Sequence, residues 1–453
     1  MDLQVAVASA KSVFTVPANP SIRKNLQPLT LDGTPYEVAA GLRHLPGLVF
    51  LDSVTAETGG LSLIGAEPES ILRGHDFRQL EAALEKRHHL TSDAGYPEGA
   101  ALGWITYEGE FCFGFYDHLL IYDHRSHTWL GSKVLAEKIR PAPVLDSVKS
   151  PVFLASISAE EYCAQVGQAR EWIAAGDIYQ VNVTHAFSAR WEGDAFALFT
   201  ALRHYSPAPY SAFLALGDGE IISSSPELFL KMSGRQIRTR PIKGTRPRHF
   251  EPVRDELLAY ELLTSPKEVA ELVMITDLER NDLGQICEYG SVRVTELLKL
   301  ERYEQVFHLV STVEGTLREN VGQVAALEAC FPGGSITGAP KKRAREIIAS
   351  LERRDRGVYT GAIGYFGYNG ESQFSIAIRT LEKRGEHLTF AVGAGIVADS
   401  EPAREYQETL DKAAGILLAC ERMGREQGSR LVSEVLAKSQ QDGYPEEQVD
   451  RGQ

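Results

Sequence analysis

The chain has 453 residues, of which 43% are hydrophobic and 24% charged, a composition typical of a soluble globular protein with a large core. Its net charge of −14 and pI of about 5.4 argue against nucleic acid and anionic membranes as partners, but not against a small anionic substrate where cations gather locally. Five widely spaced cysteines without zinc-ligand or CxxC spacing indicate reduced thiols. Residues 1–17 lack a signal-peptide pattern, and no stretch reaches the ~20 apolar residues of a membrane helix. We therefore expect a cytoplasmic protein that does not span a membrane.

The length predicts two or three domains or one large interwoven α+β unit. Residues 1–140 form a first region, followed by a Pro-containing linker up to residue 151. A second region covers residues 152–425, and the polar tail at 435–453 is expected to lie outside the fold. In the first region, apolar runs predict strands at 48–53, 62–66 and 101–107, and a short helix at 80–87.

The second region opens with a strong helix signal. Ser158 is a candidate N-cap, Glu161 stands three residues later, and apolar residues follow at helical spacing up to residue 173. Residues 178–185, which include Gln180, then alternate like a strand.

Residues 236–240 also alternate like a strand, and the segment 241–248 (PIKGTRPR) then carries two prolines and a glycine. This punctuation predicts a bend that contains Lys243 and Thr245. Lys243 is either a solvated surface charge or an amine held close to chemistry. Composition alone favours the surface, because lysine is seldom buried unless it is paired.

A helix is predicted from Ser265, with Pro266 in its first turn. Glu268 stands where it would complete a capping box. Helix capping and a functional role account equally well for a glutamate at this position. Glu271 lies one turn further along the same helix face and has no capping role. The alternative to a functional role for Glu271 is an ordinary helix position exposed to solvent.

A second helix begins near residues 400–402 and places Glu405, Glu408 and Lys412 on one face. An ordinary surface pair between Glu408 and Lys412, worth about 0.3–0.5 kcal/mol, is one interpretation. The other is that the two helices jointly hold a divalent cation. Ligands that offer only oxygen favour Mg²⁺.

Residues 331–340 (FPGGSITGAP) read as a glycine-rich turn that opens a helix. Its backbone amides either face an anion or make a tight connection. Lys341, Lys342 and Arg343 occupy the first helical turn, where the helix dipole disfavours cations. This cost predicts an anion or an acidic partner nearby.

Three more strands are predicted, at 359–365, 374–380 and 390–397. Arg379 ends the second of these, and its guanidinium suits the capture of a carboxylate. Gly393 and Gly395 in the third would let a ligand approach the backbone.

These motifs together resemble the chorismate-utilising enzymes, a family that includes anthranilate, isochorismate, salicylate and aminodeoxychorismate synthases. The resemblance covers about residues 155–420. It implies an α+β fold of two packed antiparallel β-sheets flanked by helices, to which the N-terminal region contributes. The motifs that carry it are SPE (225–227), PIKGTRPR, KEVAELVMITDLERNDL, FPGGSITGAP, YTGAIGY, AIRT, GAGIVADS and EYQETLDKA.

The resemblance also implies roles for individual residues. Glu271 and Glu408 match the Mg²⁺ ligands, with Glu268 and Glu405 beside them, and the ion would neutralise the ring carboxylate of chorismate. Glu227 matches the general acid at the C4 hydroxyl, which requires a raised pKa. The remaining matches are Tyr359 and Arg379 at the enolpyruvyl carboxylate, backbone donors at Gly393 and Gly395, the cation Lys412, His308 near the substrate ring, and Thr245 in the lysine motif.

Two positions separate the members of the family. Gln180 stands where isochorismate and salicylate synthases carry a water-activating lysine, so water chemistry is disfavoured. Lys243 replaces the alanine typical of anthranilate synthases and marks aminodeoxychorismate synthase component I. The implied reaction is 4-amination of chorismate through a covalent Lys243 intermediate, which supplies p-aminobenzoate and folate synthesis.

The sequence contains no Cys/His arrangement that resembles a glutaminase, and the family takes ammonia from a separate glutamine amidotransferase subunit. We therefore expect a heterodimer. The alternatives are an anthranilate synthase large subunit, an isochorismate synthase, and a non-catalytic regulatory paralogue, which would be expected to lack residues such as Glu227. Relatives often have a tryptophan pocket at the position of residues 51–53, but Leu51-Asp52-Ser53 departs from the form found in feedback-regulated members, which leaves a structural tryptophan possible.

Overall fold

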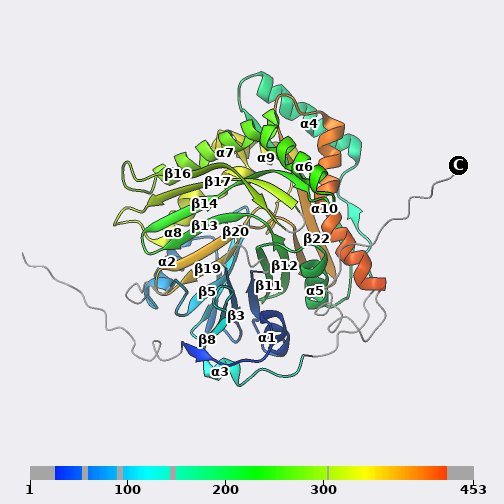
Figure 1. Cartoon of the computed structure of the whole chain (residues 1–453). Coiled ribbons are helices and arrows are strands. Elements are labelled where there is room, and N and C mark those ends of the chain that lie inside the picture. Colours follow the sequence, from blue (N-terminus) through cyan, green and yellow to red (C-terminus); the bar gives the residue numbers. More distant parts are fainter. Residues whose placement is uncertain (1–25, 54–59, 89–94, 143–148, 304–305, 426–453) are drawn as a thin grey trace, which may run out of the picture.

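The computed structural model describes residues 26–53, 60–88, 95–142, 149–303 and 306–425 (Figure 1). The predicted tail at 435–453, the segment 1–17 and part of the predicted linker lie outside the described residues. Within them, the chain folds into a 12-stranded and a 10-stranded antiparallel sheet with ten α-helices. The predicted α+β fold of two packed antiparallel sheets is therefore confirmed.

The first sheet joins strands from both predicted regions of the chain, since β2 of the first region pairs with β11 of the second. In spatial order it contains β1 (Gln27–Leu29), β8 (Thr128–Gly131), β7 (Leu119–Asp123), β3 (Leu61–Gly65), β2 (Val49–Asp52), β11 (Tyr210–Leu216), β12 (Gly219–Ser225), β21 (Thr380–Arg384), β22 (His387–Ile396), β10 (Gln180–Arg190) and β18 (Gly338–Ala339), while β9 (Leu154–Ala155) pairs with β10.

The second sheet also combines strands of the first and the second region, because β19 pairs with β5. Its order is β15 (Ile242–Pro247), β17 (Val306–Thr316), β14 (Gln236–Arg240), β13 (Leu228–Ser233), β20 (Glu371–Ile376), β19 (Ala362–Gly367), β5 (Ala100–Ile105), β6 (Phe111–Tyr116) and β4 (Ser70–Gly74), while β16 (Arg293–Arg302) pairs with β17.

Apolar side chains of both sheets meet in a shared core that includes Leu63, Leu102, Leu214 and Ile363. Helices cover the sheets, with α5 and α10 beside β12 and β22, and α7 against β15–β17 (Figure 1). The helices are α1 (Pro35–Gly41), α2 (Phe77–Glu85), α3 (Lys133–Ala136), α4 (Ala159–Ala174), α5 (Ala195–Tyr205), α6 (Pro252–Thr264), α7 (Pro266–Gly284), α8 (Gln323–Cys330), α9 (Lys341–Glu352) and α10 (Pro402–Arg425).

Several predicted elements lie where the sequence pattern places them. The capping box of α4 is present, with Ser158 and Glu161 bonded reciprocally. Two strand boundaries were wrong. The strand predicted from residue 359 begins only at Ala362, and the strand predicted to reach residue 380 ends at Ile376. A residue with positive φ lies in each connecting turn, Thr360 at 61° just before β19 and Arg379 at 49° between β20 and β21.

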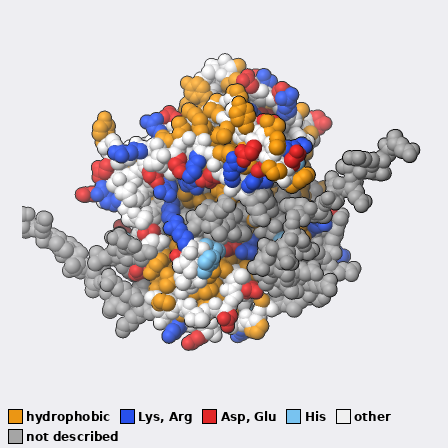
Figure 2. Space-filling model, viewed as in Figure 1, with side chains coloured by type: hydrophobic (Ala, Val, Ile, Leu, Met, Phe, Trp, Pro, Cys, Tyr) orange, Lys and Arg blue, Asp and Glu red, His pale blue; other side chains and the backbone are white. Residues whose placement is uncertain are grey.

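Every helix that the structure describes is too short or too polar to cross a bilayer. On the face shown in Figure 2, acidic and basic side chains of the described residues lie interspersed, without one continuous basic surface. This distribution agrees with the net negative charge of the chain.

Candidate active site

The segment that carries Lys243 is a strand, not the predicted bend. β15 pairs with β17 at the sheet edge, and its register shifts between Lys243 and Thr245. The intervening Gly244 has φ of +75°, which makes this shift a β-bulge. A Cβ at Gly244 would come within 2.6 Å of Leu262 and 3.0 Å of Glu268 Oε2, so the bulge passes close to α6 and α7. The two prolines and the glycine therefore signal an irregular edge strand.

Lys243 and Glu227 meet at Ser335 in the glycine-rich turn. The Lys243 Nζ donates to the Ser335 carbonyl at 3.3 Å. Glu227 is buried, and burial raises its pKa, although the Ser335 hydroxyl and the charge of Lys243 act in the opposite direction. A raised pKa is what a carboxyl group needs in order to protonate a leaving group near neutral pH.

Gln180 lies beside this pair. Its side chain is fully buried, and neither amide atom has a hydrogen-bond partner among the described residues. A Cβ at Gly395 would lie 2.5 Å from the Gln180 Nε2 and 3.7 Å from the Lys243 Nζ, so these groups converge on the glycine. At Gly393 the carbonyl accepts a 2.9 Å bond from the Lys412 Nζ. Since buried amides are normally bonded, Gln180 indicates a place for a water or a ligand.

The capping box predicted for Glu268 is only half present. The Ser265 hydroxyl accepts from the Glu268 amide at 3.4 Å, but the Ser265 amide donates to Leu262. This occurs because α6 ends directly at Ser265, so the amide already has a helical acceptor. The Glu268 carboxylate faces Arg246 instead, at 3.5 Å.

Acidic side chains of α7 and α10 face one another across Lys267. The Lys267 Nζ lies 3.2 Å from Glu405 Oε1 and 3.9 Å from Glu271 Oε1. Glu408 pairs with Lys412 at 2.8 Å, as the surface-pair interpretation predicts. Glu271 Oε1 and Glu405 Oε2 are buried and have no hydrogen-bond partner among the residues that the structure describes.

The pKa values of two of these carboxyl groups are shifted in opposite directions. Burial raises the pKa of Glu271, although Lys243 and Lys267 oppose the shift. Burial also acts on Glu408, but the adjacent Lys412, with help from Lys267 and Lys243, outweighs it and lowers the pKa of Glu408.

The side chains fit a hard divalent cation in their chemistry. Carboxylate oxygens are the ligands Mg²⁺ prefers, and two of the buried oxygens lack partners. Within the described ranges, no three Asp, Glu, His or Cys side chains are already gathered as metal ligands. The carboxylates are instead paired with lysine and arginine side chains, as described above.

His308 is held beside Thr245 across the β15–β17 ladder. Its Nδ1 and the Thr245 Oγ1 are 2.9 Å apart. Burial, together with the nearby charge of Arg379, lowers the pKa of His308 to about 4, so the imidazole is neutral at pH 7. It can act there as a neutral donor or acceptor.

Arg379 and Tyr359 both lie in turns outside the strands. Burial lowers the pKa of Arg379, and none of the ion pairs within the described residues involves its guanidinium. Burial raises the pKa of Tyr359, so its hydroxyl stays protonated. An inward-held guanidinium without a carboxylate partner is suited to bind an anionic ligand.

The glycine-rich turn faces internal carboxylates. The Gly334 amide donates to Glu279 Oε1 at 3.0 Å, and Lys341 pairs with Asp282. Burial raises the pKa of Glu279, opposed by Lys341. The acidic partner predicted for the basic helix start is thus Asp282 on α7. Nothing in the sequence pattern of α7 identified this pairing.

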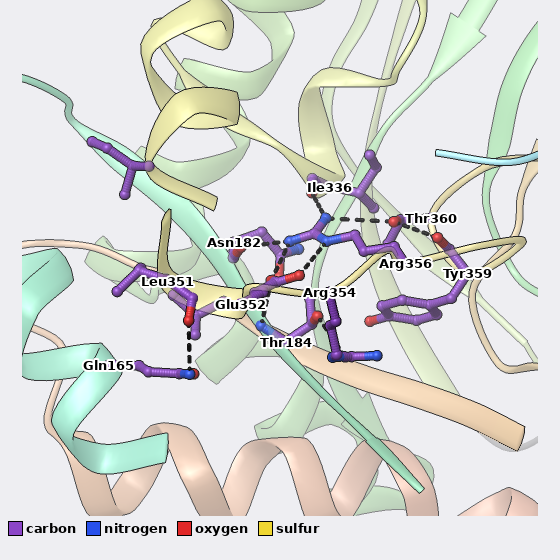
Figure 3. A network of polar contacts seen from close by, with 12 residues as sticks. Gln165, Asn182, Thr184, Ile336, Leu351, Glu352, Arg354, Arg356, Tyr359 and Thr360 are labelled. Atoms are coloured by element: carbon purple, nitrogen blue, oxygen red, sulfur yellow. Dashed lines mark hydrogen bonds and ion pairs between the residues drawn. The ribbon is translucent and has the colours of Figure 1, made fainter. Parts of the chain in front are cut away.

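A second ion-pair network, around Arg356 and Glu352, was also not predicted from the sequence (Figure 3). Arg356 bonds to both carboxylate oxygens of Glu352, at 2.7 and 2.9 Å, and to the backbone carbonyls of Asn182 and Ile336. The amide of Thr184 donates to the same Glu352 carboxylate. The network ties β10, α9 and the glycine-rich turn together. In sequence, Glu352 and Arg356 look like an ordinary surface pair four residues apart.

The region of the predicted tryptophan pocket borders a large cavity. The Asp52 carboxylate binds Arg203 at 2.7 Å and accepts from Ser62 at 2.8 Å. A cavity of about 1000 Å³ borders Ser53 and Tyr210, and a smaller one of about 30 Å³ shares these two residues. The larger cavity has room for a ligand of the size of tryptophan, so the tryptophan pocket stays a prediction.

Comparisons with known proteins agree with this architecture. The model of the chorismate binding enzyme family matches residues 66–418. The chain is 47% identical over 271 residues to anthranilate synthase component 1 3 of Haloarcula marismortui, which covers 60% of this chain and about half of that relative, 54%. It is 35% identical to aminodeoxychorismate synthase component 1 of Bacillus subtilis over 86% of this chain and 90% of the relative.

A solved structure gives the same result. The crystal structure of anthranilate synthase component I from Streptococcus pneumoniae superposes with a TM-score of 0.72 at 30% identity, over 79% of this chain and 92% of the other. With a family match that spans most of the sequence, the chain belongs to the chorismate binding enzyme family.

Proposed function

We propose that this protein is an aminodeoxychorismate synthase component I, which replaces the C4 hydroxyl of chorismate with an amino group. The observation that carries the proposal is Lys243, whose amine lies beside the buried Glu227 at Ser335. A nucleophile and an acid are thereby available on one side of a site with an unpartnered glutamine amide.

The proposed chemistry uses these two groups in sequence. After losing its proton, the Lys243 amine attacks C2 of chorismate, the ring double bonds shift, and the C4 hydroxyl leaves as water after protonation by Glu227. Ammonia then adds at C4, the double bonds shift back, and the lysine amine is expelled from C2. The enolpyruvyl group is retained, so the product is 4-amino-4-deoxychorismate for p-aminobenzoate and folate synthesis.

Other residues position the substrate in this proposal. Arg379 and Tyr359 bind the enolpyruvyl carboxylate, and the neutral His308, held by Thr245, faces the ring. Gln180 contacts the substrate beside Lys243. The backbone of Gly393 and Gly395 and the side chain of Lys412 complete the contacts.

Glu271 and Glu408 would hold Mg²⁺, with Glu268 and Glu405 beside them through water. The bound ion would neutralise the ring carboxylate of chorismate. The orphaned oxygens of Glu271 and Glu405 support this assignment.

Ammonia is proposed to come from a separate glutamine amidotransferase subunit in the cytoplasm. The names of several relatives, component 1 of their synthases, support a second component. A pull-down from cell extract that recovers no such subunit would count against this part of the proposal.

Anthranilate synthase component I is the second candidate, because relatives with that name match this chain as well as those named aminodeoxychorismate synthase. It would release pyruvate and form an aromatic product. Lys243 favours amination at C4 over this outcome. Gln180 disfavours an isochorismate synthase, since an amide cannot activate water as a base.

The Lys243→Ala variant tests the proposal. We expect 4-amination to fall by at least about 10³-fold, because the covalent route is lost, while Mg²⁺ binding stays intact. In the wild type without ammonium, intact-protein mass spectrometry should detect chorismate minus water on Lys243. The exposed Lys342 provides the control, because Lys342→Ala should keep full activity. Unchanged amination in Lys243→Ala would remove this lysine from the mechanism.

A further inference from the structure

Lys267 is the cation that contacts carboxylates of both acidic helices. Its amine lies 3.2 Å from Glu405 on α10 and 3.9 Å from Glu271 on α7. The two carboxylates are 3% and 10% exposed at the side chain, whereas that of Lys267 is 45% exposed. A largely buried pair of acids therefore shares one ammonium whose stem reaches solvent.

Two neighbouring cations each pair with one helix only, whereas Lys243 acts on Glu271 and Glu408 by its charge alone. Arg246 faces Glu268, and Lys412 pairs with Glu408 on its own helix. Lys267 differs because it sits between Glu271, a proposed metal ligand on α7, and Glu405, which would stand beside the ion through water on α10. Among the described residues, one further oxygen of Glu405 and the near oxygen of Glu271 have no hydrogen-bond partner, so the ammonium satisfies this pair incompletely.

A divalent ion and an ammonium group cannot share these oxygens without strong repulsion. Mg²⁺ binds carboxylate oxygens at about 2.1 Å, so an ion held by Glu271 would stand within several ångströms of the Lys267 amine. Like charges at such separations repel even when solvent screens them. The half-exposed lysine can relieve the repulsion by turning its amine into water.

We propose that Lys267 is a resident counter-cation that competes with Mg²⁺ for the carboxylates of α7 and α10 and thereby sets the affinity for the ion. Glu271 exchanges the ammonium for the metal, Glu405 exchanges it for a water beside the ion, and Lys267 moves outward when they do. This inference rests on the metal ligands of the proposed function. It assigns Lys267 a positioning role without contact to the reacting atoms.

The test compares Lys267→Met with the wild type by isothermal titration with MgCl₂ in the absence of chorismate. Methionine keeps the length and the apolar stem but removes the charge. We expect Mg²⁺ to bind on the order of tenfold more tightly, because one repelling charge near the site is lost. The melting temperature in EDTA should fall, and the rise on addition of Mg²⁺ should exceed that of the wild type.

Lys299 provides a matched control. It is 50% exposed and pairs with one glutamate, Glu296, on its own strand β16. Lys299→Met should leave Mg²⁺ affinity unchanged. Lys267→Gln, which keeps a polar group for Glu405, should bind Mg²⁺ more tightly in the same way and serves if the methionine variant does not fold.

The possible outcomes distinguish the competition by Lys267 from the proposed metal site itself. Equal or weaker Mg²⁺ binding by both Lys267 variants, with clear binding by the wild type, overturns the competition and leaves the metal site standing. If the wild type binds no Mg²⁺ in the millimolar range, the metal ligands and the role of Lys267 both fail.

Discussion

Two clusters of ion pairs lie near the candidate site, and they differ in how completely they are satisfied. In the Glu352–Arg356 network, both side chains are 1% exposed, and bonds reach Asn182, Ile336 and Thr184 (Figure 3). Between α7 and α10, by contrast, half-exposed lysines face carboxylates that keep unpartnered oxygens.

The difference separates a scaffold from a site for ligands. A buried charge pair with every polar atom bonded has nothing left to offer a substrate, and it stabilises one arrangement of the backbone. Buried carboxylate oxygens without partners cost stability unless something else binds them. The α7–α10 cluster therefore has the properties of a binding site, and the Arg356 network holds the strand and turns around it.

The largest expected effect comes from breaking the satisfied network. Arg356→Ala should destabilise the protein by about 3–5 kcal/mol, because it leaves the Glu352 carboxylate buried and unpaired. Urea unfolding followed by circular dichroism measures this change. Arg190→Ala removes an exposed pair with Glu386 and should cost less than about 1 kcal/mol. A cost of similar size in both variants would show that the buried network is not a special scaffold.

A smaller effect on stability and a larger one on ligand binding are expected for Glu271→Gln. The amide keeps the shape and removes a buried charge whose pKa burial raises, so the fold should stay intact. Mg²⁺ affinity should fall by roughly 10–100-fold, as expected for a lost ligand. Titration calorimetry with Glu314→Gln as a control, which alters an exposed pair with Arg238, provides the measurement. Wild-type affinity in Glu271→Gln would exclude Glu271 as a ligand.

The smallest effect concerns pH. His308 has a pKa of about 4 in the folded protein and about 6.5 when unfolded, so the unfolded state binds more protons between these values. Stability should therefore fall as pH drops from 6.5 towards 4, and this residue should contribute about 1 kcal/mol of the loss by pH 5.5.

The comparison needed is the wild type against His308→Asn, with His387→Asn as the exposed control. Urea unfolding at pH 7 and pH 5.5 should show a weaker pH dependence only in His308→Asn. Identical pH dependence in all three proteins would mean that His308 is not held neutral by the site.

Local signals predicted much of the fold. β14 and the start of α7 follow from alternation and capping residues that act over a few positions. The capping box of α4 is another such case.

Long-range contacts account for what local signals did not predict. The bulge at Gly244 depends on pairing with β17, and the turns at Thr360 and Arg379 look like strand in sequence. The roles of Lys267 and Arg356 could not be predicted, because the sequence shows neither which carboxylates they contact nor that these contacts are buried. Glu271 and Glu405 were recognised through family motifs, whereas their partner Lys267 and the whole Glu352–Arg356 pair required the three-dimensional arrangement.

The most direct test of the central proposal is a product assay. Purified protein would be incubated with chorismate, ammonium and Mg²⁺, with products identified by mass spectrometry and pyruvate followed by a coupled assay. We predict an aminated product that retains its enolpyruvyl group, without release of pyruvate. Formation of anthranilate together with pyruvate would contradict the role of Lys243 and assign the protein to the anthranilate synthases.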